Sequence, residues 1–216
     1  MKKVLGINAS PRKNWNTAQA VEKALEGAHQ AGAQTRLVHL YDLKFTGCLS
    51  CFACKRRENP ADICILQDEL RPLLEEIMTA DALILGSPIY FGNLSADAIA
   101  FLERLLFAPY TYSQDNLSKF TGHIASALIC TMNVNEALMQ QMDYPTLMKR
   151  YTQYMAGMLR GPSEWLAITD TLQFSDYGKY MSSIFDPEHK ARMHAEKFPK
   201  DLEKAKELGA WLATRA

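Results

Sequence analysis

The stretch KVLGINASPRKNWNT, residues 3–17, decides the fold. Residues 3–7 predict a short buried strand, and the polar residues after them lead directly into an amphipathic helix. A strand that passes through a polar loop into a helix points several free backbone N–H groups at one place, where the positive end of the helix dipole adds to them. Such a place stabilises an anion, most naturally a phosphate.

The loop differs from the two best-known phosphate-binding patterns. It lacks G-x-x-x-x-G-K-[ST], which brings a lysine and a magnesium ligand to a nucleoside triphosphate, and it lacks the G-x-G-x-x-G of dinucleotide sites. What remains is the hydroxyl and amide groups of Ser10, Asn16 and Thr17, with the charge of Arg12. These groups suit one phosphate monoester. The alternative is a helix that is merely well capped, with Asn16 or Thr17 as the N-cap.

Composition narrows the class of protein. The chain has 216 residues, of which 48% are hydrophobic, and its 24 basic and 24 acidic residues give a net charge of zero. Zero net charge argues against nucleic acid or an anionic membrane as the main partner. No apolar stretch is long enough to span a bilayer, and the N-terminus lacks the apolar core of a signal peptide, so we expect a cytoplasmic protein.

Strand and helix patterns alternate along the chain. This alternation predicts an α/β fold, a doubly wound parallel sheet of five strands with helices on both faces. We expect one domain over residues 1–216, with an elaboration at about 133–182. Ligands of such sheets bind beyond the carboxyl ends of the strands. The predicted strands are 3–7, 35–40, 82–86, 123–130 and 165–168, and the predicted helices are 18–31, 68–79, 95–107 and one that starts after Pro199.

The loop after the third predicted strand, SPIYFGN at residues 87–93, carries two aromatic residues and a glycine. Tyr90 and Phe91 would flank a flat ring, and the glycine would let backbone N–H groups approach an acceptor on that ring. The alternative is that both are core aromatics at a strand end. Because one loop suits a phosphate and the other a planar heterocycle, flavin mononucleotide (FMN) fits both. Residues 131–133, after the fourth strand, start at the same edge and are placed to touch the ring.

The two loops together resemble those of the NAD(P)H-dependent FMN reductases of the flavodoxin-like superfamily. The likeness rests on GINASPR with Asn16-Thr17, and on GSPIYFG at residues 86–92. It implies a flavodoxin-like fold, FMN bound without a covalent link, and a homodimer or homotetramer. Trp15 stands where the family often has glycine, and Asn93 replaces the commoner serine. The resemblance implies that Ser10, Arg12, Asn16 and Thr17 bind the phosphate and that Pro88, Ile89, Tyr90, Phe91, Gly92 and Asn93 surround the isoalloxazine.

Four cysteines lie between the two loops. Cys48, Cys51 and Cys54 form C-x-x-C-x-x-C, and Cys64 follows after nine intervening residues. Four thiolates at such spacing can bind a [4Fe–4S] cluster or a tetrahedral zinc. This segment resembles that of the iron–sulfur flavoproteins, which usually have a shorter gap before the fourth cysteine. The alternatives are free thiols or a disulfide, and Cys130, in the fourth strand, is predicted to be plain core.

Together these patterns predict an FMN-dependent oxidoreductase. It would accept hydride from NAD(P)H and pass electrons to a small-molecule acceptor (a quinone, a nitroaromatic or free flavin) or to an iron–sulfur centre. We assign no catalytic side chain, because the cofactor carries the reaction. The alternative is a non-catalytic electron-transfer flavoprotein, either an iron–sulfur flavoprotein or a flavodoxin-like carrier. Flavodoxin-like carriers are typically acidic, and the zero net charge argues against that class.

Overall fold

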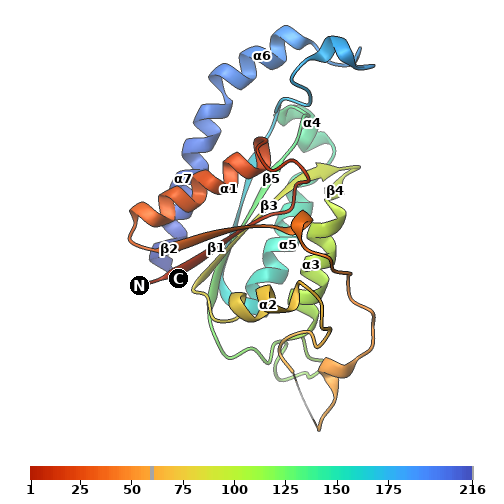
Figure 1. The fold of residues 1–216 in the computed structure, drawn as a ribbon, viewed down its shortest axis with the longest axis vertical. Coiled ribbons are helices and arrows are strands. Elements are labelled where there is room, and N and C mark those ends of the chain that lie inside the picture. The colour runs from red at the N-terminus through yellow and green to blue at the C-terminus, as the bar shows by residue number, and fades with distance from the viewer. Residues whose placement is uncertain (59–60, 216) are drawn as a thin grey trace.

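The computed structural model describes residues 1–58 and 61–215. The chain forms an α/β fold on a parallel sheet with the strand order β2-β1-β3-β5-β6, and short β4 pairs antiparallel with the end of β3 (Figure 1). This confirms the predicted doubly wound five-stranded sheet. The strands are β1 (Lys3–Asn8), β2 (Gln34–His39), β3 (Ala82–Tyr90), β4 (Asn93–Leu94), β5 (Ile124–Thr131) and β6 (Arg160–Ile168).

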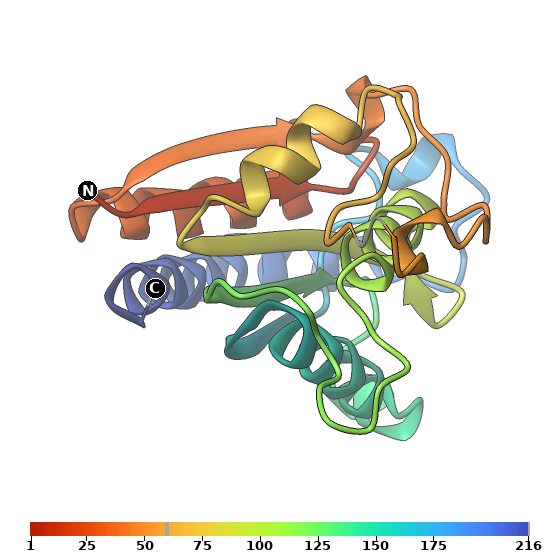
Figure 2. The ribbon, with the colours of Figure 1, turned by 90° about the horizontal axis from the view of Figure 1, so that it is seen from below.

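Helices cover both faces of the sheet. In Figure 2, α2 and α5 lie in front of the strands and α1 and α7 behind them. Each layer encloses its own buried apolar cluster, so the core has two halves with the sheet between them. The helices are α1 (Asn16–Gln30), α2 (Arg71–Ile77), α3 (Ala96–Phe107), α4 (Glu136–Gln141), α5 (Tyr144–Leu159), α6 (Pro187–Glu196) and α7 (Phe198–Arg215).

Two glycines let α1 and α7 pack at close range. A Cβ atom at Gly27 would lie 1.9 Å from the carbonyl oxygen of Lys206, and one at Gly209 would lie 1.7 Å from that of Ala24. Real Cβ atoms do not approach backbone this closely, so any larger residue would push the helices apart. This packing ties the C-terminal helix to the element that begins at the first loop.

The predicted elements are present, with some changed bounds. β3 continues four residues beyond Gly86 to Tyr90, because its end pairs with β4. β6 begins at Arg160, directly after α5, rather than at 165. The region at 133–182 contains α4, α5 and β6, and α5 packs against β5 and β6. In the described part of the chain, no helix has the length and apolar character that crossing a membrane requires.

The register of the sheet brings the predicted loops together. Asn8 at the end of β1 pairs with Gly86 in β3, and Pro88 in β3 pairs with Thr131 at the end of β5. A Cβ at Gly86 would lie 2.3 Å from Val21 of α1, so glycine allows the helix to sit close to the strand. The first and second loops therefore leave the sheet at the same rim.

Candidate functional site

A cavity of about 380 Å³ lies at this rim. Eight of the ten residues that the sequence assigned to FMN line it: Ser10, Arg12, Asn16, Thr17, Pro88, Ile89, Tyr90 and Phe91. Thr131, Met132 and Asn133 line it as well, as expected for the residues that follow the fourth predicted strand. The two loops thus face one space, whereas Gly92 and Asn93 lie off the cavity.

The start of α1 keeps its donors available. Its N-cap is Trp15, in extended conformation, and among the described residues no side chain caps the helix. The interpretation of Asn16 or Thr17 as a plain N-cap is therefore wrong. The first-turn N–H groups therefore have no side-chain cap, and uncapped N–H groups at a helix start are suited to bind an anion such as phosphate.

Two buried hydroxyl groups flank this helix start. Ser10 Oγ accepts a hydrogen bond from the backbone N–H of Arg12 at 3.2 Å, so its own proton is free for another acceptor. Thr17 Oγ1 lies 2.7 Å from Thr131 Oγ1, and this pair shares one proton between its oxygens and has a second to donate. Ser10 and Thr17 are 4% and 2% exposed, so an anion between them would be largely shielded from water.

Three other donors of the loop contact residues 170–173, which we call the wall segment because three of its residues line the cavity. Arg12 Nη1 donates to the carbonyl of Gln173 at 2.7 Å. Trp15 Nε1 and Asn16 Nδ2 donate to the carbonyl of Leu172 at 3.2 and 2.9 Å. The side chains of Arg12 and Asn16 thus bind the backbone of the wall segment.

The second loop is a turn between β3 and β4. Phe91 and Gly92 both have positive φ, +48° and +77°, and Phe91 is fully exposed. Tyr90 is 44% exposed, so the interpretation of these aromatics as core residues is wrong. Asn93 Oδ1 accepts from the Tyr151 hydroxyl at 3.1 Å, which binds the turn to α5. The turn therefore presents aromatic side chains at the open mouth of the cavity.

A serine connects the two loops. Ser95 Oγ donates to the carbonyl of Ala9 at 2.7 Å and accepts from the N–H of Ala98, where it caps α3. The N–H of Ser95 donates to Ser87 Oγ at 2.9 Å. This buried chain of hydrogen bonds fixes the spacing between the first and the second loop.

Sequence reasoning missed six residues that line the cavity, of which Trp15 belongs to the first loop. Thr171, Leu172 and Gln173 follow β6, and their position at the rim follows from the rule that parallel strands end at one edge. The topology could therefore have found them. Met142 and Tyr144 come from the junction of α4 and α5, where Asp143 has a φ of +54°. No local pattern marks that junction.

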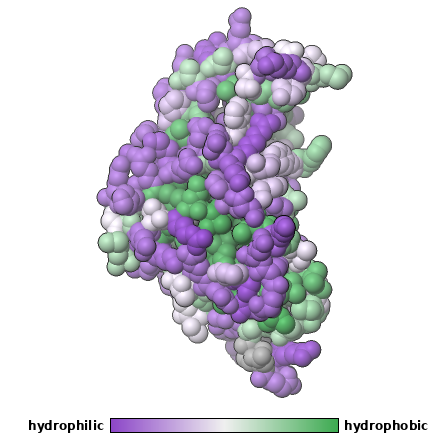
Figure 3. Space-filling model, in the orientation of Figure 1, coloured by the Kyte–Doolittle hydropathy of each residue, from purple (hydrophilic) through white to green (hydrophobic). Residues whose placement is uncertain are grey.

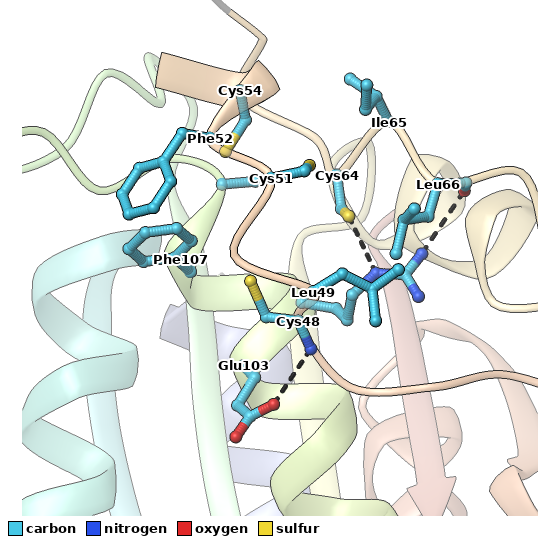
Figure 4. A pocket seen from close by; sticks show the side chains of 12 residues that line it. Cys48, Leu49, Cys51, Phe52, Cys54, Cys64, Ile65, Leu66, Glu103 and Phe107 are labelled. Atoms are coloured by element: carbon cyan, nitrogen blue, oxygen red, sulfur yellow. Dashed lines mark hydrogen bonds between the residues drawn. The ribbon is translucent and has the colours of Figure 1, made fainter.

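The four cysteines surround a second hollow (Figure 4). Cys48, Cys51, Cys54 and Cys64 all line it, and they are free thiols, as is Cys130 in β5. The space between the side chains is small, about 10 Å³, so the thiols would have to swing outward to bind a four-iron cube. Within residues 1–58 and 61–215, no three Cys, His, Asp or Glu side chains are placed to bind one metal ion.

The hollow is apolar at its mouth. Leu49, Phe52 and Ile65 are 62%, 49% and 41% exposed. On the face drawn in Figure 3, apolar side chains gather at the lower right, over the cysteine-bearing loop of Figure 1. Cys130, by contrast, is buried in the sheet, where burial raises the pKa of its thiol. The prediction that Cys130 is a core residue is confirmed.

Arg104 of α3 contacts both ends of the loop that contains Cys48, Cys51, Cys54 and Cys64, which we call the cysteine loop. Its Nε donates to Cys64 Sγ at 2.8 Å, and its Nη atoms donate to both oxygens of Asp68 and to the carbonyl of Thr46. Burial alone would raise the pKa of Asp68, but the hydrogen bonds and charge of Arg104 outweigh burial and lower it. The guanidinium therefore joins the two limbs of the loop, while the neighbouring Glu103 accepts the N–H of Cys48 at 3.0 Å.

Comparisons with known proteins find a matching family model and similar sequences. A model of the family described as NADPH-dependent FMN reductase matches residues 2–159. An iron–sulfur flavoprotein of Methanocaldococcus jannaschii is 35% identical over 102 residues, 47% of this chain and 51% of that protein. One of Methanosarcina thermophila is 32% identical over 102 residues, again 47% and 51%. The chain spans about half the length of the curated relatives it matches.

Solved structures share the fold. An NAD(P)H:quinone oxidoreductase from Methanothermobacter marburgensis has a TM-score of 0.69 at 16% identity, over 96% of this chain and 94% of that one. An FMN-dependent NADH-azoreductase from Bacillus anthracis, solved in complex with FMN, has a TM-score of 0.64 at 12% identity, over 99% and 100%. At such identities the likeness concerns the fold alone.

Proposed function

The chain belongs to the NADPH-dependent FMN reductase family, and from this premise we propose that it is an FMN-dependent oxidoreductase that takes hydride from NAD(P)H. The observation that carries the proposal is the shared cavity: a loop with hydroxyl donors beside an uncapped helix start and a turn with exposed aromatics line the same space. Neither feature alone requires a flavin, but a phosphate tethered to a planar ring satisfies both.

We assign the phosphate to the buried end of the cavity. Ser10 and Thr17 would donate their free hydroxyl protons to it, and the uncapped N–H groups of α1 would add backbone donors. Arg12 and Asn16 support the same end indirectly, because their side chains bind the wall segment. This set of donors fits a dianionic monoester without a metal ion.

The ring would lie along the second loop, between residues 88–91 and residues 131–133. Gly92 and Asn93 lie off the cavity, so the backbone of residues 89–91 is the better candidate to face the polar edge of the ring. When bound, FMN supplies the chemistry, since it accepts a hydride and returns electrons singly or in pairs. Arg12 is the one charged residue among the described residues that line the cavity, and we assign to the protein the role of orienting the reactants.

The cysteine hollow supports an iron–sulfur centre as one electron acceptor. Four free thiols line one hollow, and the two curated relatives above are named iron–sulfur flavoproteins. We propose that Cys48, Cys51, Cys54 and Cys64 bind a [4Fe–4S] cluster in the native protein, with zinc and free thiols as the alternatives. Iron and acid-labile sulfide would be measured on protein purified without oxygen. Cys51→Ser should lower both, whereas the matched control Cys130→Ser, in the buried strand, should leave them unchanged.

The proposed oxidoreductase activity can be tested by mixing FMN-loaded protein with NADPH, or with NADH, in the absence of oxygen. Prompt bleaching of the flavin band is expected, and the faster nucleotide identifies the donor. Bleaching that requires an added reductase would contradict the enzyme and support the electron carrier. Protein that takes up no FMN would contradict both.

We also propose that the protein is a cytoplasmic homodimer or homotetramer. A reducing compartment keeps the free thiols available. Apolar side chains beyond the wall segment are exposed, including Tyr180, Met181 and Ile184 at 55%, 106% and 87%, and a second copy of the chain would cover them. Sedimentation of the purified protein gives the subunit count.

A further inference from the structure

The wall segment is contacted by α6 as well as by the first loop. Asp170 has a φ of +62°, in the left-handed region, and is 7% exposed. Its Oδ2 accepts from His189 Nε2 at 2.7 Å, and its Oδ1 accepts from Lys190 Nζ. Both partners belong to α6, so that helix holds Asp170 in a strained conformation that would otherwise be costly.

Lys190 is the more unusual partner, because it is only 4% exposed. Besides Asp170, its ammonium donates to the carbonyl of Asn133 at 2.5 Å and lies 5.7 Å from the centre of the Phe185 ring. Asn133 and the wall segment both line the cavity. One buried charge therefore joins two separate parts of the cavity wall without lining the cavity itself.

The contacts continue from the wall segment to the phosphate end. Thr171 donates both its N–H and its hydroxyl to the carbonyl of Met132. Leu172 and Gln173 then accept the side-chain donors of the first loop. The connection thus runs by a hydrogen bond from Lys190 to Asp170, along the backbone of the wall segment, and by further hydrogen bonds to the side chains between Ser10 and Thr17.

We propose that Lys190, acting through Asp170, is a positioning residue for the phosphate end of the flavin site and sets the preference for FMN over riboflavin. The proposal rests on the proposed function. A buried lysine must be paired, and removing its charge would leave His189 as the remaining original partner of Asp170 and loosen the strained backbone that fixes the two carbonyls. The first loop would then lose the partners that hold it in place. Binding of the phosphate would weaken more than binding of the ring.

The test measures dissociation constants for FMN and riboflavin, which differ by the phosphate alone. Lys190→Gln keeps a donor but removes the charge. We expect it to weaken FMN binding by about tenfold, the order of affinity lost when an ordered segment becomes mobile, and to weaken riboflavin binding much less. Lys179→Gln is the matched control: its side chain is 74% exposed and pairs with Asp176 beyond the wall segment. It should change neither constant.

The ratio of the two constants separates positioning from a purely structural role, because general destabilisation weakens both ligands alike. An unchanged ratio in Lys190→Gln would overturn the proposal. If that variant does not fold, the isosteric Asp170→Asn carries the test, with a smaller shift in the same direction expected and an unchanged ratio again decisive. Wild-type protein that binds neither flavin would overturn the proposed function itself, and this assignment with it.

Discussion

The rim cavity and the cysteine hollow are built in different ways. The cavity lies on the ends of β1, β3 and β5, whose register fixes where each loop begins. The hollow lies in irregular chain, where Ser50 and Phe52 have positive φ and Arg104 joins the two limbs. The first site therefore depends on the sheet and its core, and the second on a few buried charges. We expect the two to respond separately to mutation.

The largest effect should come from Arg104→Met. Its side chain is fully buried, and its loss removes the charged partner of Asp68 and the donor to two carbonyls, those of Thr46 and Leu66. Removing one partner of such a pair should lower the free energy of unfolding by about 3 kcal/mol, measured by urea denaturation. Limited proteolysis should cut within residues 44–68, whereas FMN affinity of the folded protein should change less than about twofold.

Arg71→Met is the control for this variant. Arg71 donates to the carbonyl of Cys64 at 2.8 Å, but not to its sulfur, and pairs with the exposed Glu75. The Arg71→Met substitution should lower the free energy of unfolding by at most about 1 kcal/mol. An equal loss in both variants, or a collapse of FMN binding in Arg104→Met, would show that the two regions are not independent.

The second-largest effect is expected at the end of the cavity to which we assign the phosphate. Ser10→Ala combined with Thr17→Ala removes two hydroxyl donors, each worth roughly 1.5 kcal/mol to a charged acceptor. FMN affinity should therefore fall about 100-fold, measured by the change in flavin fluorescence. The cysteine loop should keep its resistance to protease.

Thr79→Ala combined with Ser113→Ala matches this change in chemistry at two exposed positions. That control should bind FMN as the wild type does. A Ser10/Thr17 variant that kept full affinity would place the phosphate elsewhere.

The difference between the rim cavity and the cysteine hollow explains which features could be predicted from the sequence. The five strands follow from local apolar runs, and strand ends at one rim follow from parallel topology. The start of β6 was missed because Arg160 turns the chain in the left-handed region with no loop after α5. The cysteine spacing identifies four thiols, but their orientation depends on Arg104, 40 residues from Cys64. Contacts of that range leave no local pattern.

Acid should reveal a smaller effect at the wall segment. Burial alone would raise the pKa of Asp170, but hydrogen bonds and charge from Lys190 and His189 lower it overall from its ordinary value of 3.8. A carboxylate with a lowered folded pKa stabilises the protein above the unfolded value, and this stability is lost as pH falls through the folded pKa. The free energy of unfolding should therefore fall below about pH 4.

Asp170→Asn should be less stable near neutral pH and should lose less stability between pH 5 and pH 3, roughly the range of carboxylate titration. Urea denaturation at several pH values measures this. Parallel curves for wild type and variant would contradict the assignment of the acid sensitivity to Asp170.

The smallest change in stability is expected for Phe91→Gly. Glycine relieves the positive φ of +48°, but it also adds freedom to the unfolded chain, so the free energy of unfolding should move by less than about 0.5 kcal/mol. FMN affinity should still fall a few-fold, because the exposed ring is lost from the mouth of the cavity. A loss of stability with unchanged affinity would make Phe91 a structural residue.

The central claim is that two turns at one rim bind a single FMN. A crystal structure of the FMN-soaked protein tests it most directly. We expect density for the phosphate within hydrogen-bond reach of Ser10 and Thr17, and density for the ring beside residues 88–91. Density at the cysteine hollow, or a rim that stays empty at saturating FMN, would contradict the account.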